Sequence, residues 1–101
     1  MPAYLIAHID VTDLDAYLDY ARQTPRVAEA FGGRYLVKAG HAEQLEGQGR
    51  PRNVVIEFPD FESAKRYYES TDYREIMPIA LKNSIRDIVI VEGYDPAPNG
   101  A

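Results

Sequence analysis

Residues 3–11 read Ala-Tyr-Leu-Ile-Ala-His-Ile-Asp-Val, and this stretch decides the fold. It is nearly continuously apolar and rich in residues that favour strands, which predicts a strand in the interior of a sheet. A strand with one solvated face would instead alternate apolar and polar side chains. The stretch therefore predicts a sheet that is covered on both faces.

Three further stretches have strand character. They are residues 34–39, 53–58 and 86–92. Gly40 follows the second of the four predicted strands and marks a bend, after which we expect that strand to resume through residues 43–46. Residues 47–51, which contain two glycines and a proline, are predicted to form a loop before the third strand.

Helical patterns separate these strands. Apolar side chains recur at helical spacing from Leu14 to Phe31, and a variant of the capping box at residues 12–15 marks the start of this helix. Pro25 removes a backbone hydrogen bond, so we expect a break near Thr24, and two glycines at 32–33 end the helix.

A second helical region follows the third strand. Asp60 is predicted to cap a helix, and residues 70–72 are predicted to end it and cap another over about 73–84, kinked at Pro78. The resulting order, β-α-β-β-α-(α)-β, predicts an α+β, ferredoxin-like βαββαβ fold. Its four-stranded antiparallel sheet has the order 4-1-3-2, and the helices lie on one face.

The other face of this sheet has no cover within the chain. The first, third and fourth strands carry apolar side chains on both faces, and every predicted helix is already assigned to one side. A second copy of the chain is the simplest cover, because a symmetric pair buries the same patch on both subunits. The sequence therefore predicts a homodimer through the sheet face.

Composition excludes several classes of function. The chain has 101 residues, a net charge of −5 and no cysteine, which excludes disulfides and cysteine-based metal sites. Its basic residues are scattered among acids, so nucleic-acid binding is not expected. The N-terminus does not resemble a signal peptide, and no apolar run approaches the roughly 20 residues that span a membrane. We expect a cytoplasmic protein with no membrane partner.

Several short pieces, in this order and spacing, resemble one known family. They are residues 11–13 (Val-Thr-Asp) leading to Tyr17, residues 32–37 (Gly-Gly-Arg-Tyr-Leu-Val), residues 45–47 (Leu-Glu-Gly) with 50–52 (Arg-Pro-Arg), residues 55–61 (Val-Ile-Glu-Phe-Pro-Asp-Phe) leading to Ala64, Tyr68 and Tyr73, and residues 91–93 (Val-Glu-Gly). On these pieces the chain resembles the DUF1330 family of the dimeric α+β barrel superfamily, over about residues 3–94.

This resemblance implies a fold and a dimer. The superfamily includes cofactor-free monooxygenases, isomerases, haem enzymes and proteins without an established activity, so the resemblance implies no single chemistry. We expect one ferredoxin-like α/β-barrel domain over residues 1–94 and a flexible C-terminal tail over residues 95–101.

His8 is the first candidate for chemistry, because the ordinary pKa of histidine suits a general acid or base near neutral pH. In the predicted sheet the end of the first strand lies near the starts of the third and fourth, which brings His8 towards Arg52, Asn53, Ser84 and Asp87. An Asp–His pair would orient the imidazole ring. The alternative is a structural network that closes this end of the sheet.

Three more candidates lie on strands. A buried Glu57 would have a raised pKa and could act as a base, although an ion pair with Arg34 or Lys38 is the reading we favour. Tyr35 could line a pocket and donate a hydrogen bond, or contact the second subunit. Arg52 could hold a carboxylate with both branches of its guanidinium, or form a surface ion pair.

Eight tyrosines are many for this length. Five of them lie on predicted helices: Tyr17, Tyr20, Tyr67, Tyr68 and Tyr73. Phenols inside a pocket could hold an aromatic or oxygenated ligand. The alternative is that their rings pack in the core and their hydroxyls reach solvent.

Two functions remain open from the sequence. The first is a protein that binds or transforms a small organic molecule without a metal or nucleotide cofactor, as an oxygenase or isomerase does. Its candidate catalytic residues are His8, Asp87 and Glu57, and its candidate ligand-binding residues are Tyr35, Arg52, Tyr68 and Ser84. The second is a non-catalytic homodimer with a structural or stress-related role, which predicts a filled core with no cavity above roughly 300 Å³.

Overall fold

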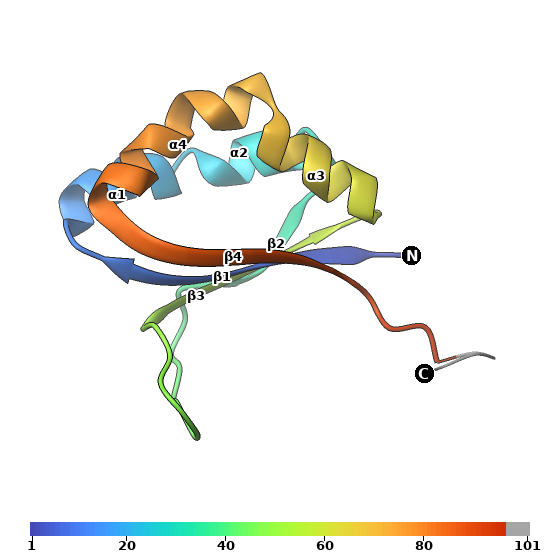
Figure 1. The fold of residues 1–101 in the computed structure, drawn as a ribbon. Coiled ribbons are helices and arrows are strands. Elements are labelled where there is room, and N and C mark those ends of the chain that lie inside the picture. Colours follow the sequence, from blue (N-terminus) through green and yellow to red (C-terminus); the bar gives the residue numbers. More distant parts are fainter. Residues whose placement is uncertain (97–101) are drawn as a thin grey trace.

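A single antiparallel sheet lies under a layer of helices in the computed structural model, which describes residues 1–96 (Figure 1). Its strands are β1 (Ala3–Val11), β2 (Arg34–Lys38), β3 (Arg52–Phe58) and β4 (Ser84–Glu92). The order across the sheet is β2-β3-β1-β4, and every neighbouring pair is antiparallel. The predicted 4-1-3-2 order and the interior position of the first strand are therefore confirmed.

The helices are α1 (Leu14–Ala21), α2 (Thr24–Glu29), α3 (Phe61–Glu69) and α4 (Thr71–Asn83). The predicted break separates α1 from α2. Pro25 lies in the first turn of α2, where backbone N–H groups make no hydrogen bond within the helix, so its missing N–H costs none. Asp60 caps α3 as predicted: its Oδ1 accepts a hydrogen bond of 2.7 Å from the Ser63 amide. The helix α4 runs through Pro78 without interruption.

The cap of α1 differs from the prediction. Thr12 was the expected first residue of a capping box, but Asp13 is the N-cap, and its Oδ1 accepts from the amide of Ala16 at 3.2 Å. The amide of Thr12 instead donates to the carbonyl of Asn83 at 2.9 Å. Thr12 therefore joins the end of β1 to the end of α4.

The two glycines after α2 end it as predicted. Gly32 has a φ of +80°, in the left-handed region, and the amide of Gly33 donates to the carbonyl of Ala28 at 2.9 Å. A Cβ built on Gly33 would lie 2.7 Å from the Phe58 ring. Only glycine lets the chain pass this close to β3.

The predicted continuation of the second strand through residues 43–46 is wrong. Ala39 has a φ of +58° and turns the chain out of β2, and residues 40–51 form a loop on the side of the sheet away from the helices (Figure 1). Leu45 is 85% exposed, so this segment has no buried apolar side to hold it against the sheet. The predicted tail begins at residue 95, and most of it, residues 97–101, lies outside the described residues.

Side chains of β1 alternate between the two faces of the sheet. Ala3, Leu5, Ala7 and Ile9 point to the helices and are at most 4% exposed. The alternate residues point to the other side, which we call the open face. There β4 contributes Ile85, Val89 and Val91, which are 44–56% exposed. The described residues thus leave apolar side chains uncovered on this face, as the sequence predicted.

Candidate functional site

The sheet divides the predicted site residues between its two faces. His8, Glu57 and Asp87 lie on the open face, whereas Tyr35 and Arg52 lie on the side of the helices. This division follows from the alternation of side chains along strands. The candidate proton carriers therefore do not meet Tyr35 and Arg52 in one site.

On the open face, His8 lies between Asn53 of β3 and Asp87 of β4 in the register of the sheet. Its Nδ1 is 2.7 Å from the Asn53 Oδ1. The Arg50 guanidinium bridges Asp10 at 2.6 Å and Asp87 at 2.8 Å, so Asp87 has an arginine rather than the imidazole as its hydrogen-bond partner. An open hollow of about 470 Å³ under the 40–51 loop is bordered by His8, Asp10, Arg50 and Asp87.

Three other predicted residues have structural partners. The Glu57 carboxylate accepts a hydrogen bond from Arg34 at 2.9 Å, which is the ion pair favoured from the sequence. The Ser84 hydroxyl donates to the carbonyl of Ala80 at the end of α4. The Tyr68 ring packs against Tyr73 and does not line the cavity described next.

A small cavity lies between the sheet and the helices. Its volume is about 30 Å³, enough for a few water molecules. Its polar lining consists of five tyrosines, a threonine and three basic residues: Tyr17, Tyr20, Tyr35, Tyr67, Tyr73, Thr24, Lys38, Arg52 and Arg86. No aspartate or glutamate is among the described residues that line it. We call this space the helix-side cavity.

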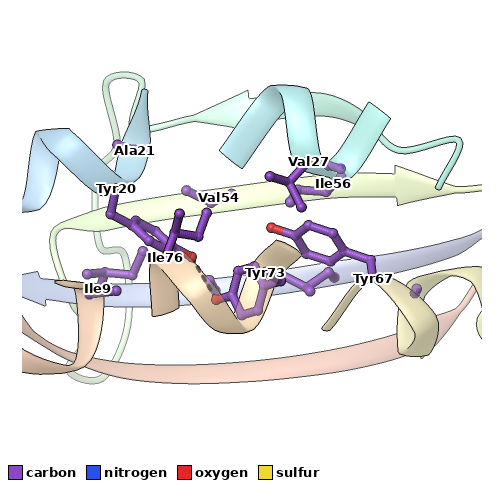
Figure 2. Packing of buried hydrophobic residues seen from close by; sticks show 14 of the residues in the cluster. Ile9, Tyr20, Ala21, Val27, Val54, Ile56, Tyr67, Tyr73 and Ile76 are labelled. Atoms are coloured by element: carbon purple, nitrogen blue, oxygen red, sulfur yellow. Dashed lines mark hydrogen bonds between the residues drawn. The ribbon is translucent and has the colours of Figure 1, made fainter. Parts of the chain in front are cut away.

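Arg86 connects the two helices that cover this cavity. Its Nη1 donates to the Tyr20 hydroxyl of α1 at 2.9 Å and to the Tyr73 hydroxyl of α4 at 3.3 Å. Those two hydroxyls are 2.7 Å apart, and Figure 2 shows them meeting between their helices. Arg86 also stacks on Tyr20, with its Cζ 5.3 Å from the ring centroid. The network fixes a charged group at the floor of the cavity.

A second arginine mirrors Arg86 across β1. Ile9 pairs with Arg52 of β3 on one side and with Arg86 of β4 on the other, so both arginines rise from the same row of the sheet. The Cζ of Arg52 lies 5.3 Å from the centroid of the Tyr17 ring. The Nε atoms of both arginines are buried and have no hydrogen-bond partner. Two cations thus share this row, each with an unused donor.

The phenols around them are proton donors at neutral pH. Burial raises the pKa of Tyr35 to about 12 and holds that of Tyr20 well above its ordinary value. Burial also raises the pKa of Tyr17, although the Arg86 and Arg52 charges oppose it, and raises that of Tyr67. The cavity therefore combines neutral hydroxyls with guanidinium groups and has a net positive charge.

One edge of the cavity reaches the surface at β2. The Tyr35 hydroxyl donates to Thr24 Oγ1 at 2.6 Å and ties β2 to the start of α2. Lys38 lies beside Tyr35, with its Nζ 5.4 Å from the ring centroid. Both Tyr35 and Lys38 also line a surface groove of about 430 Å³ outside. Tyr35 and Lys38 therefore connect the cavity with the surface groove.

The sequence reasoning missed Arg86 as a candidate. It had one usable signal: residue 86 shares its phase with Ile88 and Ile90, which face the helices in β4. An arginine in the buried phase of a strand needs partners. Here they are Tyr20, which is 66 positions away in α1, and Tyr73, which is 13 positions away in α4.

No metal site or membrane helix is found in the described part of the chain. Residues 1–96 contain no group of three or more histidine, aspartate or glutamate side chains placed to hold a metal ion. None of the helices described there is long and apolar enough to cross a membrane.

Comparison with known proteins identifies a family and a fold. The family model "Domain of unknown function (DUF1330)" matches residues 2–94, and no curated protein matches the chain in sequence. A dimeric ferredoxin-like protein of unknown function from Jannaschia is 10% identical, with a TM-score of 0.75, covering 92% of this chain and 100% of its own. A protein of unknown function from Rhodopseudomonas palustris is 15% identical, with a TM-score of 0.74 and coverages of 94% and 84%.

A third similar structure has a described activity. It is SnoaB, a cofactor-independent oxygenase from Streptomyces nogalater, which is 10% identical, with a TM-score of 0.67 and coverages of 97% and 98%. At this level of identity the likeness concerns the fold alone.

Proposed function

The chain belongs to the DUF1330 family, and we propose that it binds a small organic molecule in the helix-side cavity and transforms it without a metal or nucleotide cofactor. One observation carries the proposal: Arg52 and Arg86 line a cavity together with five tyrosines and no aspartate or glutamate, and the Nε atoms of both arginines are buried without a hydrogen-bond partner. Buried polar and charged groups are normally paired, so two such arginines beside a cavity mark a place for a ligand.

The residues of the cavity suit reactions in which the substrate becomes negatively charged. Guanidinium groups and neutral phenols that line the same cavity can donate hydrogen bonds to a developing oxyanion and stabilise it. Oxygenation or isomerisation through an enolate has this requirement. The similar fold of SnoaB, described as a cofactor-independent oxygenase, makes oxygenation the first activity to test.

Among the sequence candidates, Tyr35 and Arg52 belong to this proposed site as ligand-binding residues. The catalytic roles predicted for His8, Asp87 and Glu57 remain predictions that concern the open face. The ligand-binding roles of Tyr68 and Ser84 also remain predictions, and neither residue lines the helix-side cavity.

A cavity-filling variant tests the proposal. Ala21 lines the cavity and is 5% exposed, so Ala21→Leu places extra carbon atoms inside it. Ala30, the C-cap of α2, is exposed, so Ala30→Leu makes the same substitution outside the cavity and is the matched control. NMR spectra of tyrosine rings, recorded with a panel of neutral and charged small molecules, should shift in the wild type and the control but not in Ala21→Leu. Shifts that persist in folded Ala21→Leu would place the binding elsewhere.

A non-catalytic homodimer is the second candidate function, and one observation favours it. The volume of the helix-side cavity, about 30 Å³, is far below the roughly 300 Å³ at the lower end of ligand pockets. Under this alternative the arginines and tyrosines only join the helices to the sheet. The panel above would then shift no tyrosine resonance in the wild type.

We further propose that the homodimer forms through the open face. Ile85, Val89 and Val91 are exposed there, and the similar Jannaschia protein is described as dimeric. A second copy would cover these side chains, whose exposure to water is unfavourable. Location in the cytoplasm remains a prediction from the sequence.

A further inference from the structure

No carboxylate balances the positive charge of the helix-side cavity among the described residues that line it. Arg22, Arg34 and Arg50 each form an ion pair with an aspartate or glutamate. Arg52 and Arg86 instead face phenols, and no aspartate or glutamate is among the described lining residues. Two like charges on one row of a buried sheet face repel each other, and water cannot screen them fully.

Resting on the proposed function, we infer that the ligand is a small monocarboxylic acid whose carboxylate is held between Arg52 and Arg86. One negative charge placed between two cations relieves their repulsion. A carboxylate has two acceptor oxygens, which can accept hydrogen bonds from the guanidinium groups of two arginines that line the same cavity. Guanidinium–carboxylate hydrogen bonds are also among the strongest that proteins make.

The size of the cavity agrees with this assignment. About 30 Å³ accommodates a group of a few atoms, such as a carboxylate, rather than a whole substrate. The rest of the ligand has to extend towards the β2 edge, where Tyr35 and Lys38 border both the cavity and the outer groove. The acid group therefore enters first and the organic part fills the passage behind it.

Lys38 at this edge adds a third positive charge on the path. Its pKa is lowered by burial and by the nearby Arg52 charge, which shows that it shares the field of the cavity. A positive charge at a mouth raises the local concentration of anions and speeds their association. Neutral molecules of the same shape gain nothing from it.

Acetate and benzoate, compared with acetamide and benzamide, test the assignment. The pairs differ in charge but barely in shape. In NMR titrations of the full chain, the acids should shift the Tyr17 and Tyr73 resonances with dissociation constants at least about tenfold lower than the amides. Equal affinity of acid and amide in the cavity would overturn the carboxylate assignment and leave the proposed function intact. Absence of binding by all four would overturn both.

Matched arginine variants complete the test. Arg52→Met removes one charge of the pair and should abolish the preference for the acids. Arg22→Met removes an equal charge from an exposed ion pair with Asp19 on α1 and should keep it. If Arg52→Met does not fold, Arg52→Lys replaces it in the test. This variant keeps the charge but loses the planar set of donors, so benzoate should bind severalfold more weakly. A preference that survives in folded Arg52→Met, or benzoate binding to Arg52→Lys that is as tight as to the wild type, would contradict the inference.

Discussion

The hydroxyls of Tyr20 and Tyr73 lie 2.7 Å apart, although the residues are 53 positions apart in sequence and belong to α1 and α4. Both accept hydrogen bonds from Arg86 on the sheet beneath them. One polar cluster thus connects the two helices and the sheet around the helix-side cavity. Its side chains have to stay neutral or cationic for the cavity to favour an anion.

The first prediction concerns this cluster. Tyr73→Phe removes the hydroxyl that binds both Tyr20 and Arg86, leaving buried donors without a partner. We expect the free energy of unfolding to fall by about 1–3 kcal/mol, measured by urea denaturation. Tyr4→Phe is the control, because the Tyr4 hydroxyl makes only a 3.4 Å contact with Glu57. Equal losses in both variants would show that the cluster adds no particular stability.

The second prediction concerns high pH. In the folded protein Tyr35 has a pKa of about 12, above the ordinary value of 10.0, because it is buried. The unfolded chain therefore loses this proton first, so the stability is complete below pH 10 and falls as the pH rises towards 12. The loss from Tyr35 alone is about 2–3 kcal/mol. Tyr17, Tyr20 and Tyr67 shift in the same direction.

Urea denaturation at several pH values above 9 measures this loss. Tyr35→Phe should reduce the fall in stability between pH 10 and 12, because the variant has one fewer buried phenol to titrate. A stability that is constant over this range in the wild type would mean that the tyrosines ionise in the folded protein as easily as in water.

The third prediction concerns the glycine beside β3. A Cβ at residue 33 would lie 2.7 Å from the Phe58 ring and 2.8 Å from the carbonyl oxygen of Ala28. Gly33→Ala should lower the free energy of unfolding by about 1–3 kcal/mol, as overpacking does. Gly40→Ala, which meets nothing within 4 Å, should change it by less than about 0.5 kcal/mol. The reverse ranking in thermal denaturation would show that the end of α2 is packed differently.

The fourth prediction concerns assembly. Val89→Lys places a charge on the open face, where Val89 is 50% exposed, and should convert the proposed homodimer to a monomer. Leu81→Lys is the control, because Leu81 is 59% exposed but belongs to α4 on the other side of the sheet. Sedimentation velocity at micromolar concentration distinguishes the two species. A wild-type protein that is monomeric under these conditions would disprove the dimer.

The sequence predicted the fold in detail because the caps and breaks of its helices agreed with the spacing of its apolar residues. The apolar run of β1, the cap at Asp60 and the break near Thr24 each identified an element that the structure confirms. The predictions failed where a single residue decides the path. Ala39, at a positive φ that alanine seldom adopts, turns the chain away from the predicted second half of β2.

The candidate site was harder to predict, because its members come together only through the sheet register. The sequence predicted that His8, Asn53 and Asp87 lie together, and the register of the sheet confirms this. The sequence did not determine to which face of the sheet they point. Residue type alone favoured histidine and carboxylates as candidates for chemistry. Arg86 lies in the cavity instead, and its tyrosine partners are set by the packing of α1 and α4, which no short motif encodes.

A crystal structure of the protein with 4-bromobenzoate tests the central claim most directly, because the anomalous signal of bromine locates the ligand without ambiguity. We predict a carboxylate between Arg52 and Arg86, with the bromine towards the groove at Tyr35 and Lys38. A ligand bound instead beside Arg50 in the hollow of the open face, or an empty helix-side cavity at saturating ligand, would contradict the account.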